Sequence, residues 1–237
     1  MAASLAVVVS FYSERSVEPL AQLIQQILSL GVRPLVVINQ AESTEWRTLQ
    51  SIKQCNLVER INTGMNIGAW LHGIRQVDAD AYICLQDECS LVTHTSIHTY
   101  EQLILNTPRV GLWGETLNVR WSRPWATLMS AAVGDVTLQE RARLYASKLD
   151  RFGLPRVEHA GHLRSLVWGF DRETAELLKT LPDGTTKNDC VALEIGASQL
   201  VMAKGRKIAQ SADEPFRYFR HQEWREDGLS KREEYAS

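Results

Sequence analysis

Residues 62–88, NTGMNIGAWLHGIRQVDADAYICLQDE, decide the expected fold. The stretch opens with a loop rich in glycine and asparagine, continues as a helix and then an apolar strand, and stops at two carboxylates, Asp87 and Glu88. Ligands of open α/β sheets collect just beyond the carboxyl ends of the strands. Adjacent acids placed there hold a divalent cation against a substrate diphosphate. The stretch therefore suggests a nucleotide-binding loop beside a metal-diphosphate site.

The composition is that of an ordinary globular protein. The chain has 237 residues, of which 44% are hydrophobic and 23% charged, and its formal net charge is -2. This length suits one large domain with a sizeable core, and the charge gives no reason to expect a nucleic-acid partner.

Targeting and membrane signals are missing from the sequence. Residues 1–14 begin with a short apolar run that has no basic start, which predicts a first strand instead of a signal peptide. No apolar run approaches the ~20 residues that cross a bilayer. The cysteines contain no Cys-x-x-Cys pair and are expected to be buried, reduced thiols: Cys55, Cys84, Cys89 and Cys190. We expect a cytoplasmic protein with at most peripheral membrane contact.

Strand and helix signals alternate through the first half. Four short apolar runs predict strands, at residues 5–11, 34–38, 57–61 and 81–85. Helical spacing lies between them, at residues 17–30, from Ser43 or Thr44 to about 54, and at 67–77. This alternation predicts an α/β fold with a mostly parallel central sheet and helices on both faces.

The second half is less regular. Helices are expected at residues 96–106, 138–152, 172–181 and 189–203, and strands at 109–113 and 163–170. The tail from Glu214 is polar, charged and aromatic, with weak structure signals. Because no convincing linker or repeat occurs, we expect a single domain, residues 1–237.

The acids and the loop each have a plainer interpretation. Asp87 and Glu88 could form a turn that leads into a helix, and on spacing alone this is as probable as a metal site. In the loop, Asn66 could be the N-cap of the helix that follows. The glycines at 64 and 68 permit close backbone approach to a ligand, but the spacing is not that of a dinucleotide-binding motif.

Glu194 is the only charged residue between Asp189 and Lys204, in an otherwise apolar helical stretch. Such a carboxylate lies either on a narrow exposed face or near a functional site. Partial burial would raise its pKa and suit it to proton abstraction.

Tryptophans and histidines offer weaker candidates. Trp121 and Trp125 lie in an irregular stretch with two arginines, a composition that suits sugar stacking but favours core anchors slightly more. The histidine pairs 94/98 and 159/162 have zinc-like spacing without a carboxylate or cysteine pattern to complete a site.

Together these segments resemble the GT-A nucleotide-sugar glycosyltransferases. Residues 10–14 are similar to the turn that opens the nucleotide pocket in that family, and residues 36–39 to its second strand. The loop at 62–70 is similar to the Asn-x-Gly-x-Asp-Ile-Gly-Ala-Trp signature of the rhamnan-synthesis protein F branch. Residues 85–88 occupy the place of the Asp-x-Asp metal motif, and 193–194 with 205–208 resemble the acidic pair, helix and glycine of inverting families.

The resemblance implies roles for individual residues. The nucleotide would contact Ser10, Tyr12, Glu14, Asn39, Asn66 and Gly68. Asp87 and Glu88 would hold Mg²⁺ or Mn²⁺ on the diphosphate, and Glu194 would be the catalytic base. Trp121, Trp125 and Trp168 would shape the acceptor side. Residues 1–110 would form the donor half and 111–237 the acceptor half. Amides replace three common acids: Asn39, Asn66 and Gln86.

The hypothesis from sequence is therefore a metal-assisted, inverting glycosyltransferase that moves a sugar from a nucleoside-diphosphate donor to a glycan or glycolipid acceptor. The three amides favour an alternative, a catalytically inactive sugar-nucleotide-binding or scaffold protein. A nucleotidyltransferase is less favoured because no Gly-rich, basic triphosphate loop follows the first strand.

Overall fold

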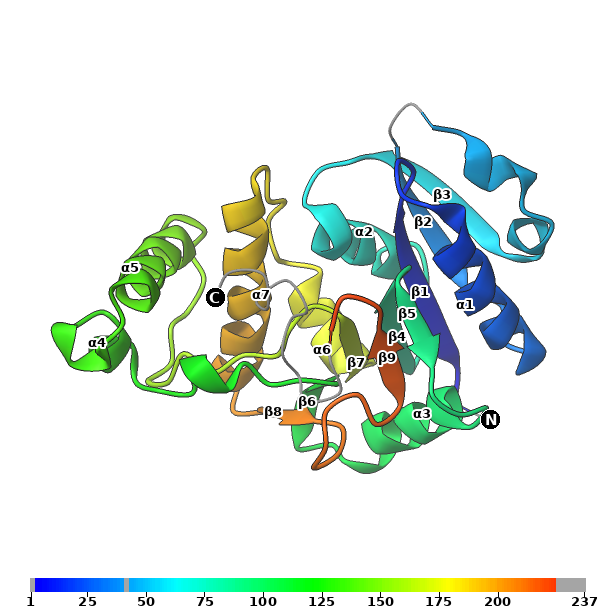
Figure 1. Ribbon diagram of the computed structural model, residues 1–237. Coiled ribbons are helices and arrows are strands. Elements are labelled where there is room, and N and C mark those ends of the chain that lie inside the picture. The colour runs from blue at the N-terminus through cyan, green and yellow to red at the C-terminus, as the bar shows by residue number, and fades with distance from the viewer. Residues whose placement is uncertain (1–2, 41–42, 225–237) are drawn as a thin grey trace.

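A seven-stranded sheet is the centre of the computed structural model, which describes residues 3–40 and 43–224 (Figure 1). In sheet order the strands are β3 (Asn56–Ile61), β2 (Leu35–Gln40), β1 (Leu5–Tyr12), β4 (Ala81–Gln86), β7 (Val167–Asp171), β6 (Val110–Gly114) and β8 (Lys207–Gln210). Every neighbouring pair is parallel except the two that involve β7. The predicted α/β fold with a mostly parallel sheet is confirmed.

Helices cover both faces because the central strands are apolar on both sides. On β1, Val7, Val9 and Phe11 belong to one core cluster, whereas Val8 belongs to the other. The first face carries α1 (Val17–Ser29) and α3 (Ser96–Asn106). The second face carries α2 (Met65–Ile74), α6 (Arg172–Leu178) and α7 (Lys187–Ala203).

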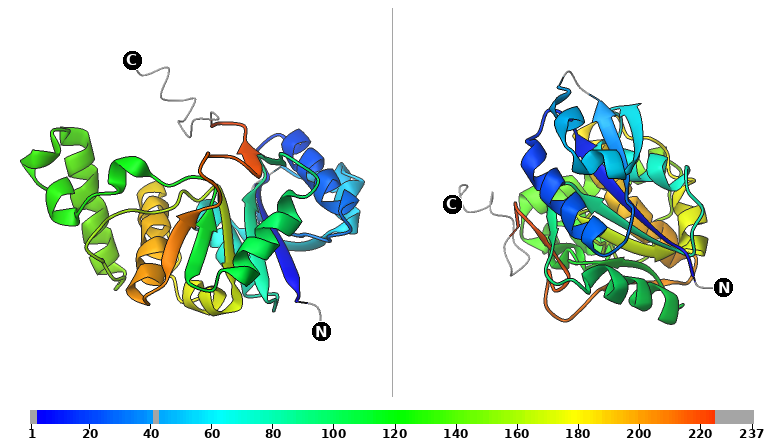
Figure 2. Two further views of the ribbon diagram at one scale, coloured as in Figure 1. Left: turned by 90° about the horizontal axis from the view of Figure 1, so that it is seen from below. Right: turned by 90° about the vertical axis from the view of Figure 1, so that its right-hand side faces the viewer.

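A third cluster extends the molecule beyond α7. Here α4 (Trp125–Leu128) and α5 (Val136–Arg151) pack on the side of α7 that faces away from the sheet. Two short 3₁₀ helices, η3 (Val119–Trp121) and η4 (Ala131–Val133), connect this region. Figure 2 shows α4 and α5 at the opposite end of the molecule from α1.

The charged tail has more order than its sequence predicts. Residues Phe219–His221 form β9, which pairs antiparallel with β5 (Cys89–Leu91). Phe219 is fully buried and contacts the Tyr100 ring at 5.2 Å between centroids. The buried Glu115 carboxylate accepts a hydrogen bond from the Tyr218 backbone N–H at 3.0 Å. The tail thereby lies against the segment that follows Asp87 and Glu88, while residues 225–237 lie outside the described part.

Several sequence predictions differ from the structure. The expected helix ending near residue 54 is two 3₁₀ helices, η1 (Glu45–Thr48) and η2 (Ser51–Gln54), separated by Leu49 in an extended conformation. Trp46 and Ile52 are buried from the two turns, a spacing that one continuous helix would not place on one face. The strand expected at residues 163–170 begins only at Val167, and the helix expected to residue 181 ends at Leu178.

The four cysteines are buried free thiols, as expected. No helix within the described ranges has both the length and the apolar content to cross a bilayer.

The chain order creates a crevice at the carboxyl end of the central strands. From β1 the chain builds β2 and β3 on one side, then returns to place β4 on the other side of β1. Such a reversal opens a ligand crevice at the carboxyl ends of the two central strands. Because β7 is antiparallel and Val167 pairs with Leu85, the residues just before β7 lie at the same edge.

Candidate functional site

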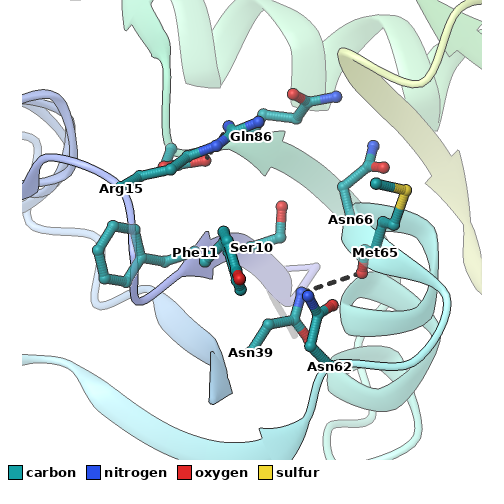
Figure 3. Close-up of a pocket in the computed structure, with 10 residues that line it drawn as sticks. Ser10, Phe11, Arg15, Asn39, Asn62, Met65, Asn66 and Gln86 are labelled. Atoms are coloured by element: carbon teal, nitrogen blue, oxygen red, sulfur yellow. Dashed lines mark hydrogen bonds and ion pairs between the residues drawn. The ribbon is translucent and has the colours of Figure 1, made fainter. Parts of the chain in front are cut away.

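A cavity of about 350 Å³ lies at the carboxyl ends of these strands. Its volume is within the size range of small-molecule sites. Its lining comes from the ends of β1, β2 and β4 and from the start of α2: Ser10, Phe11, Tyr12, Arg15, Asn39, Asn62, Met65, Asn66, Gln86 and Asp87. In Figure 3, Arg15 extends across the view toward Gln86, while Asn39, Asn62, Met65 and Asn66 lie on the other side.

Glycines shape the loop that begins α2. Gly64 is the N-cap residue and has φ +74°, a left-handed conformation that glycine adopts without strain. A Cβ on Gly68 would lie 2.1 Å from the Thr63 carbonyl oxygen, so only glycine fits there. Gly68 therefore permits close backbone packing and does not itself line the cavity. Asn66 is not the N-cap, which corrects that plainer interpretation.

Each of the three amides that replace a common acid donates to a backbone carbonyl. Asn39 Nδ2 donates to Met65 O at 3.0 Å and Asn66 Nδ2 to Ser165 O at 2.7 Å. Gln86 Nε2 donates to the same Ser165 O at 2.5 Å. An ionised carboxylate only accepts hydrogen bonds, so it would face these carbonyls without a donor. The local structure therefore requires amides at these positions.

The two acids beyond β4 are held by Arg15. Its Nη1 lies 2.6 Å from Glu88 Oε2 and 3.3 Å from Asp87 Oδ1. Asp87 is 3% exposed, and burial raises the pKa of its carboxyl to about 7 against the opposing effect of the Arg15 charge. Glu88 lies outside the cavity lining, with Oε2 3.6 Å from His221 Nε2.

The carboxylate oxygens of Asp87 and Glu88 fit a divalent cation that binds together with a diphosphate. Asp87 Oδ2 is buried and has no hydrogen-bond partner among the described residues. Mg²⁺ is commonly bound by one or two carboxylates together with substrate phosphates, with no complete protein cage. The described residues contain no cluster of three or more His, Cys, Asp or Glu side chains that could hold a metal ion. The histidine pairs 94/98 and 159/162 form no such cluster either.

Glu194 lies outside the cavity lining and is connected to it through one residue, Ser165. Its Oε2 accepts hydrogen bonds from Ser165 N at 2.7 Å and from Ser165 Oγ at 2.6 Å. Its Oε1 lies 3.5 Å from His162 Nε2, and the side chain is 17% exposed. The Ser165 peptide thus connects Glu194 to Asn66 and Gln86 of the cavity.

Burial shifts the pKa of His162, beside Glu194, toward the neutral form. Its Nδ1 lies 3.1 Å from the Ala160 carbonyl, which can only accept, so we assign the ring proton to Nδ1. Complete burial lowers the pKa of the imidazole below its usual value, although Glu194 opposes this shift. The carboxylate Oε1 is therefore the oxygen of Glu194 available to a proton donor.

The tryptophans expected at the acceptor side are largely buried. Trp168 is 1% exposed and contacts the Trp70 ring at 5.3 Å, so it is a core residue and its expected contact with an acceptor does not fit. Trp121 packs edge-on against the His162 ring at 5.5 Å. Trp125 is 5% exposed and lines a second, open cavity of about 560 Å³.

The structure thus brings together some of the residues that the sequence predicts to bind the nucleotide and the metal. The cavity lining contains Ser10, Tyr12, Asn39, Asn66 and Asp87. Glu14 is exposed and accepts a hydrogen bond from the Ser43 backbone, away from the lining. Sequence reasoning missed Arg15 and Ser165; the only signal for Arg15 was its place in the turn after the first strand.

Comparison with known protein families finds no match, and comparison with curated proteins finds none either. Solved structures share the fold. A mannosyltransferase from Pyrobaculum calidifontis, in complex with GDP-Man and Mn²⁺, has a TM-score of 0.55 at 13% identity, over 89% of this chain and 55% of the enzyme. Glucosyl-3-phosphoglycerate synthase from Mycobacterium tuberculosis has a TM-score of 0.55 at 15% identity, over 88% of this chain and 69% of the enzyme.

A further structure of the synthase contains Mn²⁺, UDP and glucosyl-3-phosphoglycerate and has a TM-score of 0.51 at 16% identity, with the same coverage of both chains. The protein therefore has the GT-A fold of nucleotide-sugar glycosyltransferases. It spans about half the length of the mannosyltransferase, and likeness at this level of identity concerns the fold alone.

Restoring an acid at position 86 should destabilise the protein. Gln86→Glu removes the donor to Ser165 O and adds charge beside Asp87 and Glu88, which should lower the free energy of unfolding by about 1–3 kcal/mol. Chemical denaturation at neutral pH measures this change. The matched control is Gln102→Glu on α3, because Gln102 is exposed and its Oε1 acts only as an acceptor, from Asn106. Equal stability of Gln86→Glu and wild type would show that the amide is dispensable.

Proposed function

We propose that the protein is a glycosyltransferase that moves a sugar from a nucleoside-diphosphate donor to a glycan or glycolipid acceptor, with inversion and with help from a divalent cation. One observation carries the proposal. The ligand crevice of a GT-A fold contains a buried carboxylate with an open oxygen, Asp87. Ser165 accepts a hydrogen bond from Asn66 of the same cavity and donates to a second carboxylate, Glu194. The resemblance of the loop to the rhamnan-synthesis protein F signature points to polysaccharide synthesis as the process.

The donor is proposed to bind in the cavity, within the half formed by residues 1–110. Ser10, Tyr12, Asn39 and Asn66 line it and would contact the nucleotide. Asp87 and Glu88 would hold Mg²⁺ or Mn²⁺, which neutralises charge on the departing diphosphate when bound. The Mn²⁺ in complexes of two structurally similar glycosyltransferases supports this assignment.

Glu194 is proposed as the general base. Ser165 fixes Oε2 with two hydrogen bonds, so Oε1 is left to accept the proton of the acceptor hydroxyl. The deprotonating hydroxyl attacks the anomeric carbon in line with the bond to the diphosphate, which breaks as the new glycosidic bond forms. Attack from the side opposite the leaving group inverts the anomeric configuration.

The acceptor would approach from the half formed by residues 111–237. Trp121 supports the ring of His162 beside Glu194, and Trp125 lines the second cavity, so both remain candidates for shaping this side.

A second candidate is a binding protein without turnover. The pairing of Arg15 with both acids favours it, because a guanidinium already neutralises the carboxylates that would hold the cation. Hydrolysis of a nucleoside-diphosphate sugar in the presence of Mn²⁺ separates the two candidates, since a pure binding protein leaves the donor intact.

A panel of nucleoside diphosphates tests donor binding directly. A ligand at 100 times its Kd stabilises the folded state by about 2.7 kcal/mol, which should raise the Tm of a chain of this size by about 5–10 °C. Thermal melting is measured for UDP, GDP, CDP and ADP, with and without Mn²⁺, against the matching nucleosides as controls. A Tm unmoved by every diphosphate at millimolar concentration contradicts the proposed donor site.

Replacement of the base should separate catalysis from binding. Glu194→Gln retains an oxygen that can accept from Ser165 but cannot take a proton, so transfer should fall by about 100- to 10,000-fold while the Kd for the nucleotide stays unchanged. Product formation and nucleotide titration measure the two quantities. Glu176→Gln, at an exposed ion pair on α6, is the matched control. Undiminished turnover of Glu194→Gln would refute the assignment.

A further inference from the structure

Arg15 is the one cationic side chain among the described residues that line the cavity. It lies in the turn after β1, where its backbone N–H donates to Tyr12 O at 2.9 Å. From there the side chain, 40% exposed, extends toward Gln86 (Figure 3), and its Nη1 contacts both acids beyond β4. The guanidinium is therefore both anchored at the cavity and accessible from it.

The two acids engage only one nitrogen of the Arg15 guanidinium. Both of its recorded contacts, to Asp87 and Glu88, run through Nη1. An arginine side chain carries five N–H donors in a planar fork. The donors on Nη2 and Nε have no partner among the described residues, so they remain available to a ligand. That fork matches the oxygens of a phosphate group, which it binds with two parallel hydrogen bonds.

The charges of the cavity require such a cation. A diphosphate that enters beside Asp87 meets a buried carboxylate with an open oxygen, and Glu88 lies next to it. Like charges this close repel strongly where little water screens them. Apart from Arg15 and Asp87, the lining is neutral: serine, aromatic, amide and methionine side chains. Of the lining groups that the structure describes, Arg15 is thus the one that can offset the charge of the diphosphate.

We propose that Arg15 is a diphosphate-binding residue, which lets the site hold a nucleoside diphosphate with or without a divalent cation. This inference rests on the proposed donor site and extends it. Without a cation, Nη1 stays on Glu88 while Nη2 and Nε bind phosphate oxygens. Donor binding is then tolerant of chelators. A cation held by Asp87 and Glu88 would itself offset the charge of the diphosphate, so Arg15 would contribute less to binding in its presence.

The test is the affinity for UDP, GDP, CDP and ADP, measured by calorimetry in EDTA and in Mn²⁺. Wild type should bind one of them in EDTA, and Arg15→Gln should weaken that binding by about tenfold or more. In Mn²⁺ the same variant should lose less than about threefold, because the cation then offsets the charge. Arg15→Lys, which keeps the charge but not the fork, should fall between these results in EDTA.

Arg172→Gln is the matched control. Arg172 is 51% exposed and also spans two acids, Asp78 and Asp80, but it lies at the amino end of β4, opposite the cavity. Its replacement should leave both affinities unchanged. Thermal melting of each variant without nucleotide verifies that the fold is intact.

Three outcomes overturn the proposed role of Arg15. Two of them leave the proposed donor site standing, and the third contradicts it as well. If wild type binds only in Mn²⁺, or if Arg15→Gln binds as well as wild type in EDTA, Arg15 has no such role while the donor site stands. If wild type binds no diphosphate in either buffer, the proposed donor site fails as well.

Discussion

The arrangement of the whole site depends on the hydrogen bonds of one residue, Ser165. It lies just before β7, whose antiparallel direction brings the start of that strand to the edge where β1 and β4 end. Buried backbone groups must find partners, because leaving one unpaired costs about as much as a lost hydrogen bond. The Ser165 carbonyl accepts hydrogen bonds from the side chains of Asn66 and Gln86. The N–H and the hydroxyl of Ser165 donate to Glu194. Groups from α2, β4 and α7 therefore meet at one residue, and the cavity and Glu194 keep a fixed relative position.

The same constraint explains the amides that replace acids common in the resembling family. Their side-chain N–H groups donate hydrogen bonds to the backbone carbonyls of Met65 and Ser165, which an ionised carboxylate cannot do. Neutral amides also reduce the negative charge around the crevice. One buried acid, Asp87, and its neighbour Glu88 remain, and Arg15 offsets part of their charge. These substitutions are thus consistent with a site that binds a diphosphate in a less acidic setting.

Sequence patterns predicted most of the sheet and the crevice, but not the contacts that organise the site. Continuous apolar runs identify β1 and β4 because strands buried on both faces need them. The acids at 87 and 88 mark the crevice because the strand ends there. The position of Ser165 depends on the antiparallel pairing of β7 with β4, a non-local contact that leaves no periodic signal. The Arg15 contact likewise joins residues more than 70 positions apart, and the segment near residue 50 forms 3₁₀ turns because tertiary burial of Trp46 and Ile52 overrides local spacing.

The central claim is that the crevice between β1 and β4 binds the donor diphosphate within reach of Glu194. A crystal structure of the protein with Mn²⁺ and the nucleoside diphosphate that raises its Tm most tests this claim directly. The account predicts electron density for the nucleotide between Ser10, Asn39 and Asn66, with the diphosphate beside Asp87 and Arg15 and the Ser165–Glu194 hydrogen bonds intact. A nucleotide bound elsewhere on the molecule, or a Glu194 side chain turned away from Ser165 and the diphosphate, would contradict it.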